Sequence, residues 1–147
     1  MATLNVAIIG QGRSGRDIHG AYLSKNPEHF RIVATVDLIE ERRQRSAREY
    51  GCDVYADYRD LMKRTDIDLV VNATPSHLHV PVTLEFLKAG FNVLCEKPFA
   101  HSVADVNKMI AAAKRSGKVL AVFQQSRYAP YFVQIQKVIA SGVLGRI

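Results

Sequence analysis

The sequence predicts an α/β fold, a doubly wound parallel sheet in three layers with the strand order 3-2-1-4-5-6. Three observations carry this prediction. Strand-like and helix-like segments alternate along the chain, the strands are apolar with short links, and a G-x-G-x-x-G turn follows the first strand. Segments that alternate in this way form parallel sheets whose right-handed crossovers place helices on both faces. We expect a ligand across the carboxyl ends of strands 1 and 4, where the strand order reverses.

Length and composition indicate a single domain of ordinary type. The 147 residues are 48% hydrophobic and 23% charged, which is typical of a globular domain with a real core. No apolar run approaches the roughly 18 residues of a membrane span, and no signal peptide precedes the first strand. Cys52 and Cys95 match no metal-binding spacing. We therefore predict a cytoplasmic protein with reduced thiols, no metal site and no membrane partner.

The formal net charge of +6 raises the question of a nucleic-acid partner. The densest basic cluster is interleaved with acidic residues: Arg42, Arg43, Arg45 and Arg48 alternate with Glu40, Glu41 and Glu49. Mixed signs on one helix indicate a solvated face, and neither zinc-finger spacing nor an RNA-binding aromatic signature accompanies the cluster. We expect no nucleic-acid partner.

The first half of the chain alternates three strands with three helices. In order, we expect a strand over Leu4–Ile9, a helix over Arg13–Asn26, a strand over Arg31–Asp37, a helix over Ile39–Tyr50, a strand over Asp53–Tyr55 and a short helix capped by Asp57. The strands are rich in β-branched residues, and Pro27 and Gly51 end the first two helices.

The second half repeats this alternation. In order, we expect a strand over Ile67–Ala73, a helix over Val80–Lys88, a strand over Phe91–Cys95, a helix from the Ser102 cap to Gly117, a strand over Lys118–Gln124 and a helix over Pro130–Ser141. The nearly continuous apolar run before Ala73 is typical of a central parallel strand. The last helix carries Phe132, Ile135, Val138 and Ile139 on one face.

The glycine turn is the candidate phosphate site. Gly10 permits the tight turn, Gly12 leaves no Cβ between backbone and pyrophosphate, and Gly15 lets the helix pack closely on the strand. Arg13 and Ser14 would contribute backbone N–H groups at the helix N-terminus, where the helix dipole favours anions. The alternative is a turn with a purely structural role, which the strand-helix context makes the weaker interpretation.

Asp37 is the candidate ligand of the adenosine ribose. It ends the second strand, 22 residues beyond Gly15, where such a carboxylate is expected. The alternative is an ordinary helix cap, since the next helix begins two residues later. A carboxylate there repels a 2′-phosphate and so favours NAD. Arg42 or Arg43 could soften that preference, which leaves NADP as a possible cofactor.

Four sequence blocks resemble the N-terminal domain of the glucose-fructose oxidoreductase/inositol dehydrogenase (Gfo/Idh/MocA) family. They are Ile9–Gly15, Ala73-Thr74-Pro75 with His79, Glu96-Lys97-Pro98, and Arg127-Tyr128-Ala129-Pro130. The resemblance spans almost the whole chain and implies a Rossmann fold that binds NAD or NADP. It also implies hydride transfer with a sugar, a cyclitol or a similar polyol.

The resemblance assigns further residues to the cofactor crevice. Ala73, Thr74 and Pro75 would form the loop at the reversal point, although Thr74 could simply cap a connector. His79 matches a position that the family often fills with His, while a His in a first helical turn is commonly structural. Gln124 resembles an amide that reaches toward the nicotinamide, and Arg127 could instead anchor the turn.

Lys97 is the candidate catalytic residue. It stands at the carboxyl end of a central strand, where its ammonium could bind a sugar hydroxyl and the nicotinamide ribose of the cofactor. If partly buried, it could also relay a proton. An exposed surface Lys is the alternative, which Glu96 and Pro98 beside it make weaker. Glu96 could pair with Lys97 or contact the nicotinamide ribose. The resemblance also raises the expectation of a cis Lys97–Pro98 bond.

Family members continue into a second α/β domain that supplies most of the substrate pocket, an acid/base pair and the oligomer interface. We expect that domain to be absent from this chain, of which residues 1–147 would be the dinucleotide-binding domain of a homo-oligomeric parent. The alternative function is a non-catalytic dinucleotide-binding or redox-sensing module. The third hypothesis is a Rossmann scaffold that has lost its affinity for the cofactor.

Overall fold

The computed structural model describes residues 2–146 and contains one parallel sheet of six strands in the order β3-β2-β1-β4-β5-β6, as predicted. The strands are β1 (Leu4–Ile9), β2 (Phe30–Val36), β3 (Asp53–Tyr55), β4 (Leu69–Asn72), β5 (Asn92–Glu96) and β6 (Leu120–Phe123). Their order reverses between β1 and β4, which lie side by side with Val6 opposite Leu69 and Ile9 opposite Asn72.

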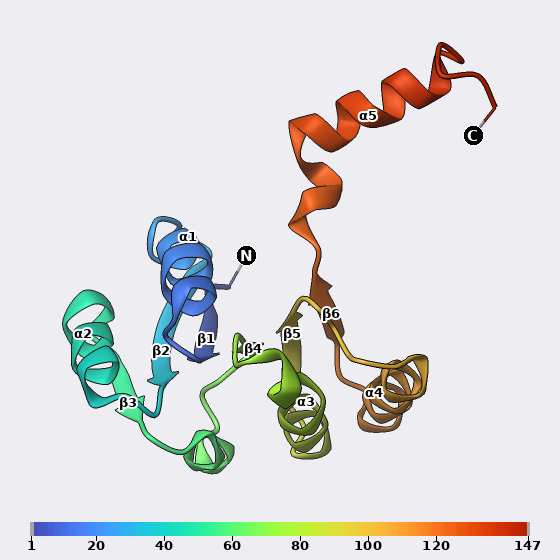
Figure 1. Ribbon diagram of the computed structural model, residues 1–147. Helices are drawn as coiled ribbons and strands as arrows, with labels where there is room; N and C mark the ends of the chain where they lie inside the picture. The colour runs from blue at the N-terminus through green and yellow to red at the C-terminus, as the bar shows by residue number, and fades with distance from the viewer. Residues whose placement is uncertain (1, 147) are drawn as a thin grey trace.

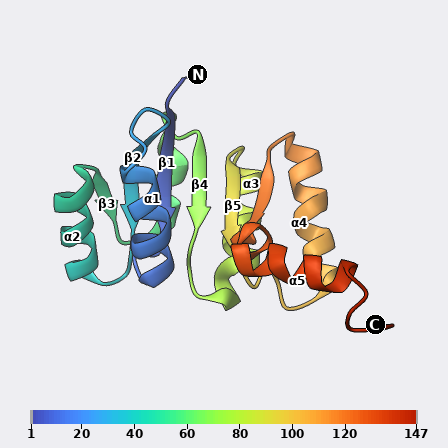
Figure 2. The same cartoon turned by 90° about the horizontal axis from the view of Figure 1, so that it is seen from above.

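Helices cover both faces of this sheet (Figures 1 and 2). They are η1 (Arg13–Gly20), α1 (Ala21–Ser24), α2 (Glu40–Tyr50), η2 (Tyr58–Lys63), η3 (Ser76–Leu78), α3 (His79–Lys88), α4 (Val103–Ser116), η4 (Gln125–Tyr128) and α5 (Pro130–Ala140). No helix within residues 2–146 is long and apolar enough to cross a membrane.

Each face of the sheet has its own core because successive side chains of a strand point to opposite faces. Along β1, Val6 and Ile8 pack with Leu23 of α1. Ala7 and Ile9 pack instead into the core that contains Phe86 of α3. The central strand is therefore apolar at consecutive positions, as the sequence predicted for a strand buried on both sides.

The first helix differs from the single helix expected over Arg13–Asn26. A π-helix, η1, spans Arg13–Gly20, and a short α-helix continues to Ser24. A π-helix joins residues five apart, so Gly15 and Gly20 share the buried face. Both positions are crowded. A Cβ on Gly15 would overlap the carbonyl oxygen of Gly10, and one on Gly20 would overlap the hydroxyl of Tyr50.

The predicted caps of two other helices are confirmed. The side chain of Ser102 accepts a hydrogen bond from the N–H of Asp105 at 3.1 Å and begins α4. Gly117 ends this helix in the left-handed conformation. Asp57 caps η2 by accepting a hydrogen bond from the N–H of Arg59 at 2.9 Å, although this helix is a 3₁₀-helix.

The last helix lies where the sequence predicts it, and its apolar face is not buried. Helix α5 begins with Pro130 at its first position and projects away from the sheet beyond β6 (Figure 1). The sequence places Phe132, Ile135, Val138 and Ile139 on one face of this helix. Among the residues that the structure describes, none of this helix is buried, and Ile135 is half exposed. The apolar periodicity is real, but the helix extends beyond the edge of the sheet and has no layer to cover.

Candidate functional site

The glycine turn brings β1, β2 and the loop after β4 into direct backbone contact. Gly10 has a φ of +91°, a conformation that glycine adopts at little cost. Its N–H donates to the carbonyl of Val36 at 2.7 Å. A Cβ at Gly10 would overlap the carbonyl oxygen of Ala73. The turn therefore fits only because Gly10 lacks a side chain.

Gly12 and Gly15 occupy opposite environments within the same turn. A Cβ on Gly15 would overlap the Gly10 carbonyl, which agrees with the predicted role of close helix packing. Within residues 2–146, the one atom near a Cβ on Gly12 would be Nη1 of Arg42 at 3.7 Å. Gly12 thus opens onto free space, and that space is where a phosphate would approach the backbone.

A pocket of about 810 Å³ lies over the glycine turn at the carboxyl ends of β1, β2 and β4. Its lining contains the predicted residues Gly10, Gly12, Arg13, Ser14, Asp37, Ala73, Thr74 and Pro75. Tyr58 and Arg59 of η2 and the exposed Leu38 complete the rim. The volume is that of a site for a drug-sized ligand or a cofactor.

Asp37 fastens the glycine turn to the start of α2. Its Oδ2 accepts a hydrogen bond from the N–H of Gln11 at 2.7 Å, and its Oδ1 accepts one from the N–H of Ile39 at 2.9 Å. Nη1 of Arg42 lies 3.4 Å from Oδ2. An ionised carboxylate can accept about four hydrogen bonds, so the group keeps capacity for a ribose hydroxyl.

The two arginines beside Asp37 are not equivalent. Nη1 of Arg43 donates to the carbonyl oxygens of Asp37 and Leu38 at 2.8 and 2.9 Å, so this guanidinium is committed to the backbone. Arg42 lines the pocket with 41% of its side chain exposed. Of the two, Arg42 is therefore the residue placed to meet a charged group on the ribose.

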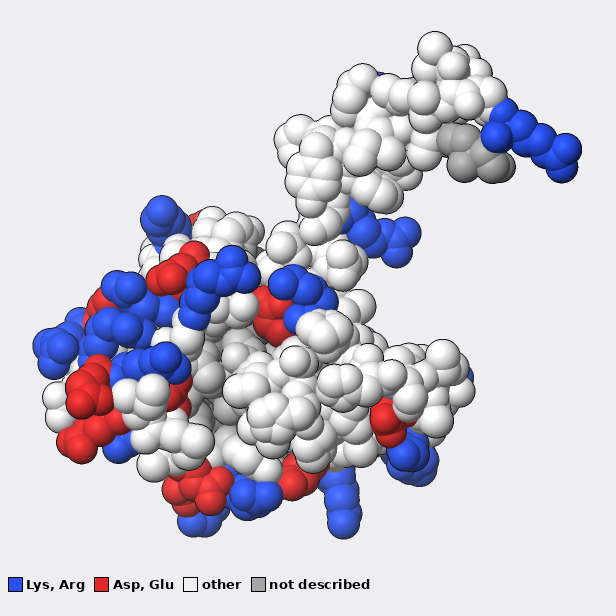
Figure 3. Space-filling model, viewed as in Figure 1, with Lys and Arg blue, Asp and Glu red and all other residues white. Residues whose placement is uncertain are grey.

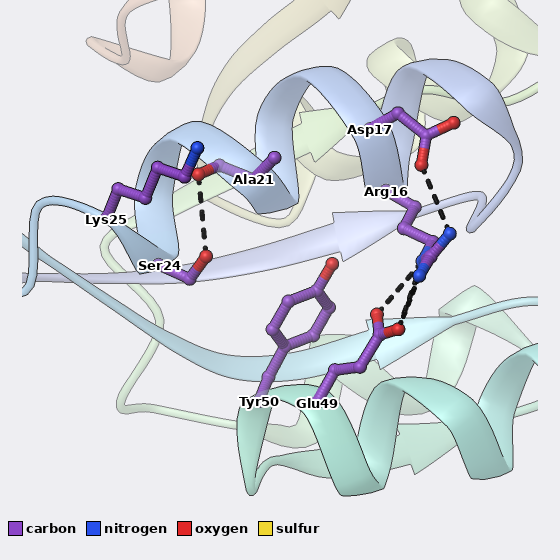
Figure 4. Close-up of a pocket in the computed structure, with 7 residues that line it drawn as sticks. All are labelled: Arg16, Asp17, Ala21, Ser24, Lys25, Glu49 and Tyr50. Carbon is purple, nitrogen blue, oxygen red and sulfur yellow. Dashed lines mark hydrogen bonds and ion pairs between the residues drawn. The ribbon is translucent and has the colours of Figure 1, made fainter.

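Basic and acidic side chains alternate over the rest of α2, as the sequence predicted (Figure 3, left). A separate hollow of about 340 Å³ lies between η1, α1 and the end of α2 (Figure 4). It is bordered by an ion pair between Arg16 of η1 and Glu49 of α2. There Nη2 of Arg16 donates to Oε1 of Glu49 at 2.6 Å, and this hydrogen bond holds the pKa of Glu49 below its ordinary value. No predicted site residue lines this hollow.

The loop after β4 is held by hydrogen bonds of its own side chains. The hydroxyl of Thr74 donates to Oδ1 of Asn72 at 2.7 Å. A backbone hydrogen bond adds to this, since the N–H of Ala73 donates to the carbonyl oxygen of Ile9 at 2.9 Å. This keeps Ala73, Thr74 and Pro75 against the glycine turn. Thr74 serves the local connection, as its alternative interpretation had it, and lines the pocket as well.

His79 joins two loops and is buried. Its Nδ1 lies 2.7 Å from the carbonyl oxygen of Pro98, and its Nε2 lies 2.9 Å from that of Thr74. A ring protonated on both nitrogens can donate to both oxygens. His79 is not among the residues that line the pocket within 2–146. Its contacts connect the loop after β4 with the turn after β5.

The turn after β5 carries the candidate catalytic residue. The Lys97–Pro98 peptide bond is cis, as the resemblance led us to expect. Lys97 is exposed at the end of the strand, so the residues that the structure describes do not themselves bury it. Glu96 is buried, and its Oε2 accepts a hydrogen bond from the N–H of Lys97 at 3.1 Å.

Gln124 and Arg127 lie farther along the same edge of the sheet. They line a hollow of about 650 Å³ beside β6 and the root of α5, together with Phe123, Tyr128 and Phe132. This hollow and the 810 Å³ pocket share no lining residue. The predicted residues thus fall into a group around the glycine turn and a second group at the ends of β5 and β6.

His19, which was not predicted from the sequence, contacts this second group. Nε2 of His19 lies 3.0 Å from Oε1 of Glu96, and both side chains are about 5% exposed or less. Burial lowers the pKa of His19, and the Glu96 carboxylate partly opposes that shift. A histidine four residues after Gly15 is the one signal in the sequence, and it does not reveal that the partner is Glu96.

Comparison with known proteins identifies this arrangement. The model of the GFO_IDH_MocA family, described as an oxidoreductase family with an NAD-binding Rossmann fold, matches residues 4–124. The chain is 35% identical to 2,7-anhydro-N-acetylneuraminate hydratase of Mediterraneibacter gnavus, over 100% of this chain and 38% of that protein. It is also 35% identical to inositol 2-dehydrogenase of Rubrobacter xylanophilus, over 95% of this chain and 40% of that protein.

A solved structure gives the same result. The WlbA dehydrogenase of Bordetella pertussis, in complex with NADH and UDP-GlcNAcA, superposes with a TM-score of 0.88 at 27% identity. The match covers 99% of this chain and 44% of that one. The chain thus spans less than half the length of these relatives. It belongs to the Gfo/Idh/MocA family of oxidoreductases, of which it is the NAD-binding Rossmann domain.

Proposed function

We propose that this chain is the cofactor domain of an enzyme that moves a hydride between NAD and a hydroxyl-bearing carbon of a sugar, cyclitol or similar polyol. The observation that carries the proposal is the shared edge of the sheet. The glycine turn and Asp37 line one pocket at the carboxyl ends of the strands, and Lys97 stands at the same edge, at the end of β5. The named activities of the inositol 2-dehydrogenase and WlbA relatives support this substrate class.

The chain's residues divide the work of this reaction. The open backbone at Gly12, with Arg13 and Ser14, fits a pyrophosphate, and Asp37 binds a ribose hydroxyl. When bound, NAD supplies the carbon that accepts the hydride. Lys97 binds the substrate hydroxyl by a hydrogen bond from its ammonium. After this ammonium has given one proton to water, the neutral amine takes up the proton that leaves the hydroxyl as the hydride departs.

The remaining parts of the proposal concern the whole protein. The chain spans 38% and 40% of the two curated relatives, so we assign most of the substrate pocket, and the subunit contacts of a homo-oligomer, to a second domain. The unpaired thiols of Cys52 and Cys95 suit the reducing cytoplasm.

A substitution of Lys97 in the complete gene product tests this function. We expect Lys97→Met to lower kcat by roughly 10²- to 10⁴-fold, the usual contribution of proton transfer, and to leave the Kd for NADH within about twofold. NADH formation from a panel of cyclitols and sugars measures kcat, and NADH fluorescence measures binding. Lys63→Met is the matched control, since Lys63 is 80% exposed and pairs with Asp60 on η2. Full kcat in Lys97→Met would reject the catalytic role. If the unsubstituted protein binds NADH but turns over none of the panel, the result favours the sensing module.

A second reaction is favoured by the hydratase relative. In that case the same site removes a hydride and later returns it, so that water is added or eliminated without net oxidation. The same assay separates the two reactions. Product formation without accumulation of NADH indicates the hydratase type, and equal amounts of product and NADH indicate a dehydrogenase.

A further inference from the structure

Two buried titratable side chains lie outside the pocket and take no part in the proposed proton relay. His19 comes from η1 and Glu96 from the end of β5. Their Nε2 and Oε1 atoms are 3.0 Å apart, and their side chains are 5% and 4% exposed. A carboxylate buried to this degree is costly unless it is paired and hydrogen-bonded. The pair therefore calls for an explanation in terms of what it holds in place.

The carboxylate of Glu96 connects His19 with the backbone of Lys97. Oε1 faces the imidazole, and Oε2 accepts a hydrogen bond from the N–H of Lys97 at 3.1 Å. The buried carboxylate thus holds the backbone nitrogen that is bonded to the Cα of Lys97, and the exposed side chain extends from this Cα. A shift of Glu96 would displace the backbone from which the Lys97 side chain extends.

The other side of the pair belongs to the glycine turn. His19 lies four residues after Gly15 on the π-helix η1. The π-helix is rare in proteins, but where it occurs it is frequently at a functional site. Its ring also packs on Phe123 at the end of β6, with ring centroids 4.4 Å apart. One imidazole therefore contacts the ends of β5 and β6 from the helix that follows the candidate phosphate site.

A second histidine holds the same turn from the opposite face of the sheet. His79 on α3 contacts the carbonyl of Pro98 at 2.7 Å. Helix α3 packs in the core with Phe86, whereas α1, which continues η1, packs in the other core through Leu23. The two neighbours of Lys97 are thus held from opposite faces of the sheet, since Glu96 contacts His19 and Pro98 contacts His79.

We propose that His19 and Glu96 are a positioning pair that fixes the Lys97 ammonium relative to the glycine turn, so that the bound cofactor and the proton relay keep a constant geometry. The proposal rests on the proposed function of Lys97. Neither member of the pair needs to touch the substrate, because both act through the backbone of Lys97. A displacement of about 1 Å at a reacting group can reduce the rate by about 100-fold, which is the scale of effect that such a pair controls.

The protonation of the pair follows from its surroundings. Glu96 of β5 is the charged group that faces the ring, and Phe123 of β6 adds an apolar contact, among the residues that the structure describes. Burial lowers the pKa of His19, so a neutral ring donates from Nε2 to the carboxylate. Because the folded pKa lies below the unfolded value of about 6.5, the unfolded chain takes up the proton first as the pH falls. The stability that the neutral His19 contributes is therefore fully present above the unfolded pKa, and it is lost as the pH falls from there through the lower folded pKa.

A double-mutant cycle in the complete gene product tests the proposal. His19→Leu removes the donor, and we expect it to lower kcat by roughly 10- to 100-fold with the Kd for NADH within about twofold. His19→Gln places an amide nitrogen near the position of Nε2 and should restore most of the rate. In a Lys97→Met background, His19→Leu should cause no further loss. Equal rates in His19→Leu and His19→Gln, or losses that multiply in the Lys97→Met background, would overturn the proposal.

A measurement on the cofactor-free protein separates this pair from the role of Lys97. Ring-nitrogen NMR of His19 should show the Nε2–H tautomer and a titration midpoint below the ordinary value. Glu96→Gln, which keeps the shape but removes the charge, should lower this midpoint further because the carboxylate no longer supports the proton. An unchanged midpoint would show that His19 and Glu96 are not paired. If the NMR result holds and Lys97→Met keeps its full kcat, the proposed function fails while the pairing stands.

Discussion

Asp37 shows how one side chain can serve structure and ligand together. Its two oxygens accept hydrogen bonds from the N–H groups of Gln11 and Ile39, which join the glycine turn to the start of α2. The carboxylate is nevertheless part of the pocket lining. Asp37 is not itself the capping residue of α2, because α2 begins at Glu40 and Ile39 holds the capping position.

Replacement of Asp37 should alter the preference between the two dinucleotides. We expect Asp37→Ala to raise the Kd for NADH by roughly 10- to 100-fold, since hydrogen bonds to a charged group are lost. The Kd for NADPH should rise much less, because the carboxylate no longer repels a 2′-phosphate near Arg42. Fluorescence titration with each dinucleotide measures both values.

Asp57→Ala is the matched control for this titration. Asp57 also lines the pocket, but its carboxylate caps η2 through the N–H of Arg59. We expect this variant to leave the ratio of the two Kd values unchanged. Equal losses of NADH and NADPH in Asp37→Ala would count against ribose recognition by Asp37.

Among the elements, the junction of β1 with η1 depends on glycines for two different reasons. Gly15 allows backbone to touch backbone, whereas Gly12 leaves space that the protein does not fill. The first serves folding, and under the proposed function the second serves binding of the pyrophosphate. Sequence spacing suggested both roles, and the structure separates them by what a Cβ would meet.

Two alanine variants should divide these roles. Gly15→Ala forces a Cβ onto the carbonyl of Gly10, so we expect the free energy of unfolding to fall by about 3 kcal/mol or more. Gly12→Ala meets its nearest neighbour, Arg42, at 3.7 Å and should keep its stability within about 1 kcal/mol, yet lose NADH affinity. Urea denaturation and NADH titration measure the two effects. A Gly12→Ala protein that binds NADH normally would place the pyrophosphate elsewhere.

The strands were predictable because their physical signal is local. Apolar runs such as the one before Ala73 appear in one stretch of sequence, and short links between alternating elements leave few topologies. The π-helix was not predictable, because apolar periodicity does not distinguish it from an α-helix over Arg13–Gly20. The pairing of His19 with Glu96 was hidden for another reason. The two residues are 77 positions apart, and only the completed sheet brings them together.

At the scale of the whole molecule, the core ends with the sheet. Both hydrophobic clusters lie within the strands and the helices that cover them, whereas α5 extends past β6 (Figure 1). The apolar periodicity of α5 shows that one face of the helix is apolar, but periodicity does not show what lies against that face.

Removal of α5 should leave the stability of the domain nearly unchanged. We expect a chain that ends at Ala129 to lose less than about 1 kcal/mol of unfolding free energy, since none of the described residues of α5 is buried. Phe86→Ala is the comparison, because Phe86 is fully buried and its truncation should cost about 3–5 kcal/mol. Urea denaturation of the three proteins measures these differences. A loss in the shortened chain as large as that of Phe86→Ala would mean that α5 belongs to the core.

The place of β1 in the sheet has a consequence for how the chain folds. Val6 of this strand lies beside Ile32 on one side and Leu69 on the other. Strand β1 therefore cannot complete its hydrogen bonding until synthesis has passed Asn72 at the end of β4. Contacts so distant in sequence require the closure of long loops before they contribute any stability, which makes folding slow. Until β4 arrives, the strand that carries the glycine turn keeps one edge open.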